Sequence, residues 1–228
     1  MKPIFKTENR FTLVDRVIKQ IREAISSGRL KPGDRLVEKD IAQGMQIGRN
    51  AVREAFRYMA KEGVVTITPF KGAHVTLHSK KEIQQMFEVM GGLEGMCARL
   101  AAQKMSQENL KELESLHTDL ETYYKKKDPE KYLKTNWAFH GLIQKFAKND
   151  VLDQVVNELR QKIFLYRKKQ LFQPNRFRAS MDEHRLIIKA FQEKNPTEVE
   201  QRMRQHLFRQ EKSLMEEDIK ECHVNHSD

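Results

Sequence analysis

The hydrophobic positions near the amino terminus recur every three or four residues, which is the spacing of one face of an α-helix. They are Leu13, Val14, Val17, Ile18, Ile21 and Ile25. Thr12 and Asp15 form a capping-box pattern ahead of them, and Gly28 suits a left-handed conformation just past the end. The pattern predicts a helix that begins after Thr12 and buries one apolar face.

A second amphipathic stretch predicts a short helix at residues 38–43, a tight connection at 44–48 and a longer helix at 49–59. One face of the longer helix is apolar, with Val52, Ala55, Phe56 and Met59. Another face is basic, because every fourth residue is an arginine: Arg49, Arg53 and Arg57. A helix, a turn and a basic helix form the arrangement that lays the second helix in the major groove of DNA. The alternative is a surface helix of alternating charge.

After Gly63 the pattern changes to that of β-strands. Residues 64–68 and 73–77 are rich in β-prone side chains, and residues 69–72 suit the tip of a hairpin. A hairpin directly after a basic helix predicts a winged helix-turn-helix. At its tip, Lys71 is a candidate for the minor groove or for a phosphate, and Gly72 lets the backbone approach DNA closely. The alternative for Lys71 is a solvated turn lysine.

The rest of the chain predicts one helix after another. Ser79 and Glu82 form a capping box that opens a helix through about Lys104. Further helices are expected to start at Ser106, near Pro129, after Asn149, near Ser180 and after Asn195. Because the stretch has no convincing strand and no glycine-rich phosphate loop, we expect an all-α bundle.

The distribution of charge supports two domains. The 228 residues carry a net charge of +10. Residues 1–78 contain 15 Lys and Arg against 8 Asp and Glu, whereas residues 79–228 contain 27 against 24. A basic excess in one third of the chain is expected where that third faces phosphates. We therefore predict a DNA-binding domain at 1–78 and a helical domain at 79–228.

The cysteine content and the hydropathy narrow the class of protein. Cys97 and Cys222 are far apart without CxxC spacing, which argues against a disulfide scaffold and a thiolate zinc site. No apolar run reaches membrane-spanning length, and the first residues lack a signal-peptide core. We expect a cytoplasmic protein with no membrane partner.

The amino-terminal motifs resemble the winged helix-turn-helix domain of the GntR family of bacterial transcription regulators. The resemblance spans residues 13–75 and is densest at 25–36, 48–55 and 62–65. It implies that Arg49 and Arg53 are the main DNA contacts, that Lys39 faces DNA, and that Asn50 and Ala51 lie where base edges are read. Two departures, Gly48 for the usual Ser or Thr and Ala51 for the common Pro, are expected to alter operator preference.

Several polar residues of the helical part have the spacing of a metal site. Asn136 and His140 are four residues apart and share one helix face, while His184 and His206 lie on two later helices. Three imidazoles and an amide oxygen on three helices can converge on a divalent metal inside a bundle. The alternative is a purely structural polar cluster.

These residues also carry a second resemblance. Residues 137–140, 183–190 and 203–207 resemble the FCD ligand-binding domain of the FadR subfamily, over roughly residues 82–215. The resemblance implies that Asn136, His140, His184 and His206 coordinate zinc, nickel or a similar metal at the floor of an effector cavity that often holds a small carboxylate.

Two positions depart from the pattern of that domain. Asn136 replaces the commoner Asp, and Met90 stands where Arg is frequent. Since an amide oxygen is neutral, the first change is expected to lower metal affinity. The second removes a carboxylate-binding arginine, for which Arg99, Arg160 and Arg167 are candidate replacements.

The resemblances imply a homodimer that binds a pseudo-palindromic operator with an affinity that changes when an effector, such as an organic acid, binds the bundle. In the family an effector either releases or tightens DNA binding, and release is the commoner response. We therefore expect the protein to act as a repressor. One alternative is a constitutive architectural DNA-binding dimer. The other is a metal-dependent enzyme fused to a DNA-binding module, which the lack of a clear general base or nucleophile disfavours.

Overall fold

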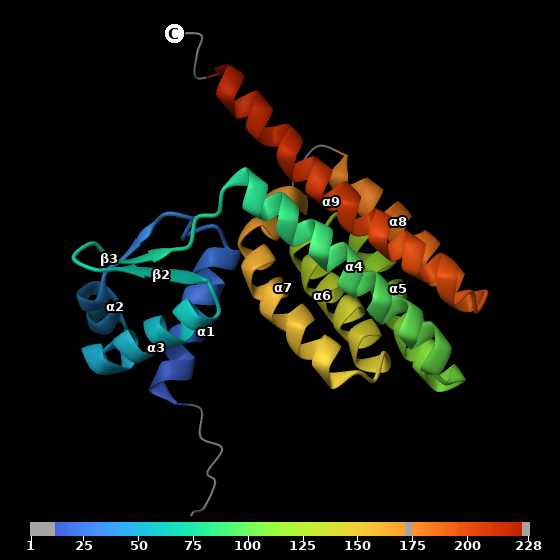
Figure 1. Cartoon of the computed structure of the whole chain (residues 1–228), viewed down its shortest axis with the longest axis horizontal. Helices are drawn as coiled ribbons and strands as arrows, with labels where there is room; N and C mark the ends of the chain where they lie inside the picture. Colours follow the sequence, from blue (N-terminus) through green and yellow to red (C-terminus); the bar gives the residue numbers. More distant parts are fainter. Residues whose placement is uncertain (1–11, 172–174, 225–228) are drawn as a thin grey trace, which may run out of the picture. The chain divides into compact units, whose positions relative to one another are not determined.

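The computed structural model describes residues 12–171 and 175–224, and the side chains within them except for those of 167–170 and 216–224. The chain forms two compact units, which divide between Leu77 and His78. The first unit contains a three-stranded sheet and three helices, and the second is helical throughout its described residues (Figure 1). The predicted fold class, a winged helix-turn-helix followed by a helical bundle, is confirmed.

The helices of the first unit are α1 (Leu13–Ser26), α2 (Glu38–Met45) and α3 (Arg49–Lys61). The predicted capping box of α1 is present, since the Thr12 hydroxyl accepts from the Asp15 amide at 3.1 Å and the Asp15 carboxylate accepts from the Thr12 amide at 2.9 Å. Buried residues of α1 and α3 form the centre of this unit: Val17, Ile18, Ile21, Ile25, Val52, Ala55, Phe56 and Met59. The apolar faces predicted for both helices are therefore correct.

The connection between α2 and α3 is shorter than predicted. Gly44 was expected in the connection but lies within α2, which continues to Met45. The helix ends at Gln46, whose φ of 55° is left-handed. The residue in the left-handed conformation is therefore a glutamine with an exposed side chain, not a glycine. The prediction that the connection starts at Gly44 was wrong.

The strands are β1 (Arg35–Leu36), β2 (Val65–Thr68) and β3 (Gly72–Val75), in the order β1-β3-β2 with antiparallel pairing. The hairpin of β2 and β3 was predicted. Strand β1 was missed, because two residues are too few to show an alternating pattern. Its single inward side chain, Leu36, is buried.

The second unit consists of six helices in the described residues: α4 (Lys80–Lys104), α5 (Gln107–Lys125), α6 (Pro129–Phe146), α7 (Asp150–Leu171), α8 (Arg176–Gln192) and α9 (Pro196–Val224). The capping box of Ser79 and Glu82 is present, and Asn195 caps α9 through its side-chain oxygen. Helix α8 begins four residues before the predicted Ser180. The Ser180 hydroxyl lies 3.0 Å from the buried Tyr132 hydroxyl instead of capping a helix.

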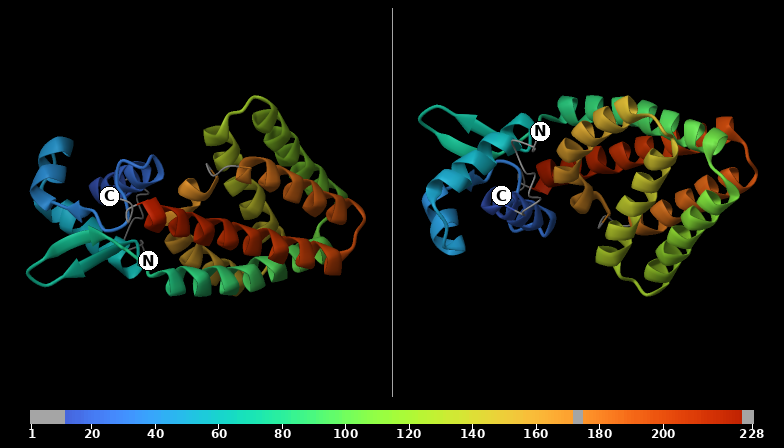
Figure 2. Two further views of the ribbon diagram at one scale, coloured as in Figure 1. Left: turned by 90° about the horizontal axis from the view of Figure 1, so that it is seen from above. Right: turned by 90° about the horizontal axis from the view of Figure 1, so that it is seen from below.

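Helices α4 and α9 run side by side along the bundle, as both views of Figure 2 show. Their close approach depends on Gly95, since a β-carbon there would lie 2.8 Å from Cγ of Arg204. The remaining helices pack around a core that includes Phe87, Leu113, Phe139, Ile163 and Phe191. Among the described residues, no helix is both long and apolar enough to cross a membrane.

Candidate nucleic-acid interface and metal centre

The exposed side of α3 carries the basic stripe predicted from the sequence. Arg49, Arg53 and Arg57 are exposed, while Val52 and Phe56 on the other side are buried in the core. A shallow groove of about 520 Å³ follows this surface, lined by Asn50, Arg53, Glu54, Arg57, Tyr58 and Lys61. The packing of α3 therefore fixes a basic surface that is open to solvent.

Arg53 is held by an acidic residue of the preceding helix. Its Nε and Nη2 donate to the two carboxylate oxygens of Glu38 at 3.2 and 2.9 Å. The pKa of Glu38 is lowered, chiefly by the hydrogen bond from Arg53, so the pair is ionised. A bidentate pair fixes the plane of the guanidinium. The sequence analysis did not identify this role of Glu38.

The start of α3 suits an anion. Gly48 makes no side-chain capping hydrogen bond there, as expected from the missing hydroxyl. Amide groups at a helix amino terminus and the helix dipole favour phosphate. Of the residues predicted to contact DNA nearby, Asn50 and Lys39 are exposed and Ala51 is half-buried. At the hairpin tip, Lys71 and Gly72 are exposed, and Gly72 has a left-handed φ of 85°.

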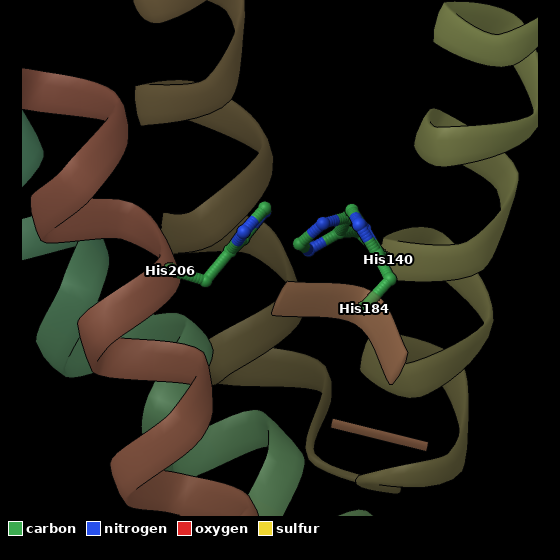
Figure 3. Close-up of side chains that lie close together, drawn as sticks. All are labelled: His140, His184 and His206. Atoms are coloured by element: carbon green, nitrogen blue, oxygen red, sulfur yellow. The ribbon is translucent and has the colours of Figure 1, made fainter. Parts of the chain in front are cut away.

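Three histidines meet inside the second unit (Figure 3). His140 comes from α6, His184 from α8 and His206 from α9, and all three are buried. Their ring centroids are 4.7 to 5.5 Å apart. Each ring offers one nitrogen, and these nitrogens lie within 4.8 Å of one another. The sequence alone predicted that these side chains would converge.

Hydrogen bonds at Nδ1 set the orientation of each ring. Nδ1 of His184 lies 2.7 Å from the Ser180 carbonyl oxygen, which can only accept a hydrogen bond. Nδ1 of His140 lies 2.6 Å from the Glu94 carboxylate, and Nδ1 of His206 lies 2.6 Å from the Glu183 carboxylate. Because the proton is on Nδ1, the lone pair of each neutral ring is on Nε2, the form that binds metals.

Two buried arginines complete the surroundings of the cluster. Arg160 donates to Glu94 at 3.0 Å, and Arg176 makes a bidentate pair with Glu183 at 2.8 and 2.5 Å. All four side chains are at most 6% exposed. Two series of contacts of the same kind therefore support the cluster: in each, an arginine pairs with a glutamate, and that glutamate accepts a hydrogen bond from a histidine.

The titration of these groups agrees with neutral imidazoles beside an ionised carboxylate. Burial lowers the pKa of His206 to about 4, against the opposing effect of Glu183. Burial and the neighbouring histidines lower the pKa of His184 well below its ordinary value. Burial alone would raise the pKa of Glu183, but hydrogen bonds from Arg176 and His206 outweigh it and lower that pKa to about 2.

Asn136 and Gln210 add two amides at the cluster. Asn136 lies one helical turn before His140 on α6, and its buried Oδ1 has no hydrogen-bond partner among the residues that the structure describes. Gln210 lies one turn after His206 on α9, and its amide nitrogen is 2.5 Å from Nε2 of His206. A buried acceptor without a donor costs free energy, and a bound cation relieves that cost.

Two family descriptions match the chain in succession. Residues 13–75 match the family described as bacterial regulatory proteins, gntR family, and residues 85–209 match the FCD domain. The chain belongs to the GntR family and carries an FCD domain. It is a DNA-binding transcriptional regulator of that type.

This GntR-family regulator has curated relatives of similar length. It is 27% identical over 209 residues to the HTH-type transcriptional regulator LutR of Bacillus subtilis (strain 168), covering 80% of this chain and 92% of LutR. It is 24% identical over 189 residues to McbR of Escherichia coli (strain K12), covering 81% and 84% of the two chains. The solved structure of E. coli McbR/YncC shares the fold, with a TM-score of 0.75, 20% identity and coverage of 90% and 98%.

The arginines predicted to bind an effector in this GntR-family regulator have different surroundings. Arg160 reaches the histidine cluster through Glu94. Arg99 is paired with Glu200 at 3.4 Å and its side chain is 43% exposed. The side chain of Arg167 lies outside the described residues. Only Arg160 is therefore connected to the cluster by the described contacts.

Besides Glu38, five residues of the two sites were not predicted from the sequence: Tyr58, Glu94, Arg176, Glu183 and Gln210. Tyr58 is 53% exposed on the basic surface of α3, and an aromatic off the apolar face was the available signal. Glu183 lies directly before His184 in the sequence, but its carboxylate reaches His206 on another helix. Contacts between helices of this kind have no signal in the spacing along one helix.

Proposed function

We propose that this regulator is a homodimeric repressor whose affinity for its operator is controlled by a small carboxylate bound at a metal ion in the FCD domain. The observation that carries the proposal is the arrangement of His140, His184 and His206, whose Nδ1 atoms are all hydrogen-bonded and which each offer one ring nitrogen within 4.8 Å of the others. Hydrogen bonds to the second nitrogen of a metal-binding imidazole are the usual support of such sites.

The donor set fits a zinc or nickel ion. Three neutral imidazole nitrogens suit either metal, and the buried Oδ1 of Asn136 offers a fourth donor. The contact of Gln210 opposes binding, because its amide occupies Nε2 of His206 and must withdraw. A metal held in this way would supply a positive charge and a coordination position for an effector oxygen.

The balance of charge around the cluster favours an anionic effector. The ion pairs of Arg160 with Glu94 and of Arg176 with Glu183 each sum to zero, and the lowered pKa values of His184 and His206 keep these two imidazoles neutral. Arg209 adds a further positive charge 3.6 Å from Glu183. A divalent cation would therefore add a buried charge of two that no side chain of these pairs cancels. Since an uncompensated buried charge is costly, an organic acid that brings a carboxylate is the expected ligand.

The proposed homodimer is supported by how such a basic helix reads DNA, and the proposed repression is supported by a relative. A dimer presents two recognition helices to the half-sites of a pseudo-palindrome. One relative, RspR of Escherichia coli (strain K12), is named a transcriptional repressor; it is 24% identical over 178 residues, or 78% of each chain. Binding to chromosomal DNA would support a role in the cytoplasm, and the names of the relatives, which are regulators, support a role without catalysis.

The test begins with selection of the operator from a random duplex library on the full-length protein. Metal is removed with a chelator and then restored as zinc or nickel, and metal content is measured by mass spectrometry. We expect about one ion per chain, and operator affinity that responds to small organic acids only in the metal-loaded protein. The double variant His184→Ala/His206→Ala should lose the metal and the response.

A matched control is His74→Ala, which removes a half-buried histidine of the first unit and leaves the cluster intact. Its metal content should equal that of the unaltered protein. Selection of no preferred sequence would contradict the operator proposal. An unchanged metal content in the double variant would show that the cluster is not the metal site.

A further inference from the structure

The tip of the hairpin between β2 and β3 exposes an aromatic side chain completely. Phe70 has a relative exposure of 108%, the highest among the exposed large hydrophobic side chains of the described residues. Thr68 pairs with Gly72, so Phe70 is the middle residue of a three-residue tip. Its ring contributes nothing to the core of the first unit.

The backbone at this tip is strained by the residue that occupies it. The Lys71 amide donates to the Thr68 carbonyl at 3.1 Å, which closes a turn with Pro69 at its second position and Phe70 at its third. Phe70 has a φ of 63°. A turn with proline and then a positive φ is of type II, where glycine or asparagine is favoured at the third position. Phenylalanine is thus both unfavourable for this backbone and unburied.

The hairpin below the tip is firmly attached to the recognition helix. Val65 and Val75 are buried, and the hydroxyls of Thr66 and Thr76 lie 3.0 Å apart across the strands. Strand β2 packs against α3. The backbone that carries Phe70 is therefore attached to α3 through the strands of the hairpin, so the tip keeps a defined position relative to the basic surface of α3.

The charge of the hairpin identifies the partner. Lys71 follows Phe70 and is exposed, and residues 63–77 contain no Asp or Glu. An apolar side chain beside a cation, with no carboxylate to repel phosphate, matches the apolar wedges that proteins insert from the minor groove between base pairs. Such a wedge partly unstacks one base step and bends the duplex.

We propose that Phe70 inserts into the minor groove of the operator flank, unstacks one base step and bends the DNA, while Lys71 contacts the adjacent phosphate. The proposal rests on the operator binding proposed above and adds a way of reading sequence through deformability. Pyrimidine–purine steps such as TA open most easily. The regulator should therefore prefer such a step at the position of the wing.

The experiment uses the full-length protein and the operator duplex obtained by selection. The bend is measured by energy transfer between dyes on the duplex ends, and unstacking by the fluorescence of 2-aminopurine placed at successive flank positions. For the unaltered protein we expect a bent duplex and a fluorescence rise confined to one step in each half-site. Phe70→Ala should abolish both signals while the operator is still preferred over other sequences.

Affinity should fall by only about threefold to tenfold in Phe70→Ala, because the gain from burying the ring is offset by the cost of unstacking. Phe70→Gly removes the strain as well as the ring and should behave like Phe70→Ala. Ile67→Ala, which removes an exposed apolar side chain from the same hairpin below the tip, should leave the bend unchanged.

Three results would overturn the proposal. The first is a straight duplex with the unaltered protein, and the second is an unchanged bend in Phe70→Ala. The third is a change of oligomeric state in Phe70→Ala with DNA binding unaltered, which would assign the ring to a second copy of the chain. Failure of the protein to select any sequence would refute operator binding itself, which is a different result from loss of the bend.

Discussion

Glu183 and His206 face each other from helices α8 and α9, with Oε2 of the carboxylate 2.6 Å from Nδ1 of the imidazole. Glu183 precedes His184 in the sequence, yet the two serve different positions of the cluster. Arg176, two turns before on α8, holds both oxygens of Glu183. The geometry of His206 is therefore set by α8, so packing between these two helices controls the cluster.

Glu183→Gln should weaken metal binding by about 10- to 100-fold, the usual effect of losing a carboxylate that orients a metal-bound histidine. The amide cannot accept both bonds of Arg176, so the free energy of unfolding should also fall, by about 3 kcal/mol. Metal affinity is measured by competition with a chelating dye and stability by urea unfolding.

The control for this variant is Glu193→Gln at the end of the same helix. Glu193 is 54% exposed and pairs with Lys189 at 3.7 Å. Exposed pairs of this kind contribute little, so stability should change by less than about 0.5 kcal/mol and metal affinity should not change. Equal metal affinities for Glu183→Gln and the unaltered protein would refute the role given to Glu183.

Asn136→Asp should strengthen metal binding and destabilise the metal-free protein. A carboxylate is a stronger donor to a divalent cation than an amide, but without the cation it is a buried charge that lacks a partner. The measurement is the melting temperature of chelated protein before and after addition of zinc or nickel. The rise caused by metal should be largest for Asn136→Asp and smallest for Asn136→Ala; the same rise in all three proteins would exclude Asn136 as a ligand.

The DNA-binding unit was largely predictable from the sequence because its signals are local. The capping box of Thr12 and Asp15 and the apolar spacing of α1 and α3 are each contained within a few neighbouring residues. The end of α2 at Gln46 and the two-residue strand β1 were not predictable in this way. The end of α2 is closed by backbone hydrogen bonds from Gln46 and Ile47 to carbonyls of the same helix, which a residue other than glycine allows here, and β1 depends on its pairing with the distant β3.

The three histidines of the cluster were predicted from the sequence, but the supporting contacts of glutamates and arginines were not. The convergence of His140, His184 and His206 was expected from helix spacing and from the family resemblance. Helix phase alone left Arg99, Arg160 and Arg167 open as candidates. Arg160 reaches the cluster through Glu94, Arg99 pairs with Glu200, and Arg176 was not among the candidates. Which side chain of one helix meets which side chain of another depends on crossing geometry, which no spacing within a helix encodes.

Cys97 should be unreactive in the folded protein. Its thiol is buried on α4, and burial raises its pKa to about 12, so the thiolate that reacts with alkylating reagents is nearly absent at neutral pH. The test is iodoacetamide labelling at pH 8 in a Cys222→Ser background, where Cys97 is the only cysteine. Labelling should require denaturant; rapid labelling of the native protein would show that the bundle opens around α4.

Arg49→Ala and Arg53→Ala should each weaken operator binding while leaving both units folded. A bidentate contact between arginine and guanine contributes about 1 to 3 kcal/mol of discrimination, whereas a phosphate contact adds affinity without sequence preference. Binding to the selected operator and to a scrambled duplex, measured over a range of salt, separates the two roles. Unchanged affinity in both variants would mean that α3 does not bind DNA.

Glu38→Gln should make DNA binding tighter on average and less selective. In the free protein Glu38 holds the guanidinium of Arg53 through two hydrogen bonds, and its negative charge lies on the surface that phosphates approach. Removing that charge should strengthen binding to scrambled duplex, because the repulsion of phosphate is lost. The guanidinium is then no longer held in one plane, so the ratio of operator to scrambled affinity should fall by about tenfold, or about 1.4 kcal/mol. The control is Asp40→Asn, which removes an exposed carboxylate of the same helix for which no contact with Arg53 is present. The ratio of operator to scrambled affinity should stay unchanged in this control. A fall of equal size would assign the effect to net charge instead of to the pair of Glu38 and Arg53.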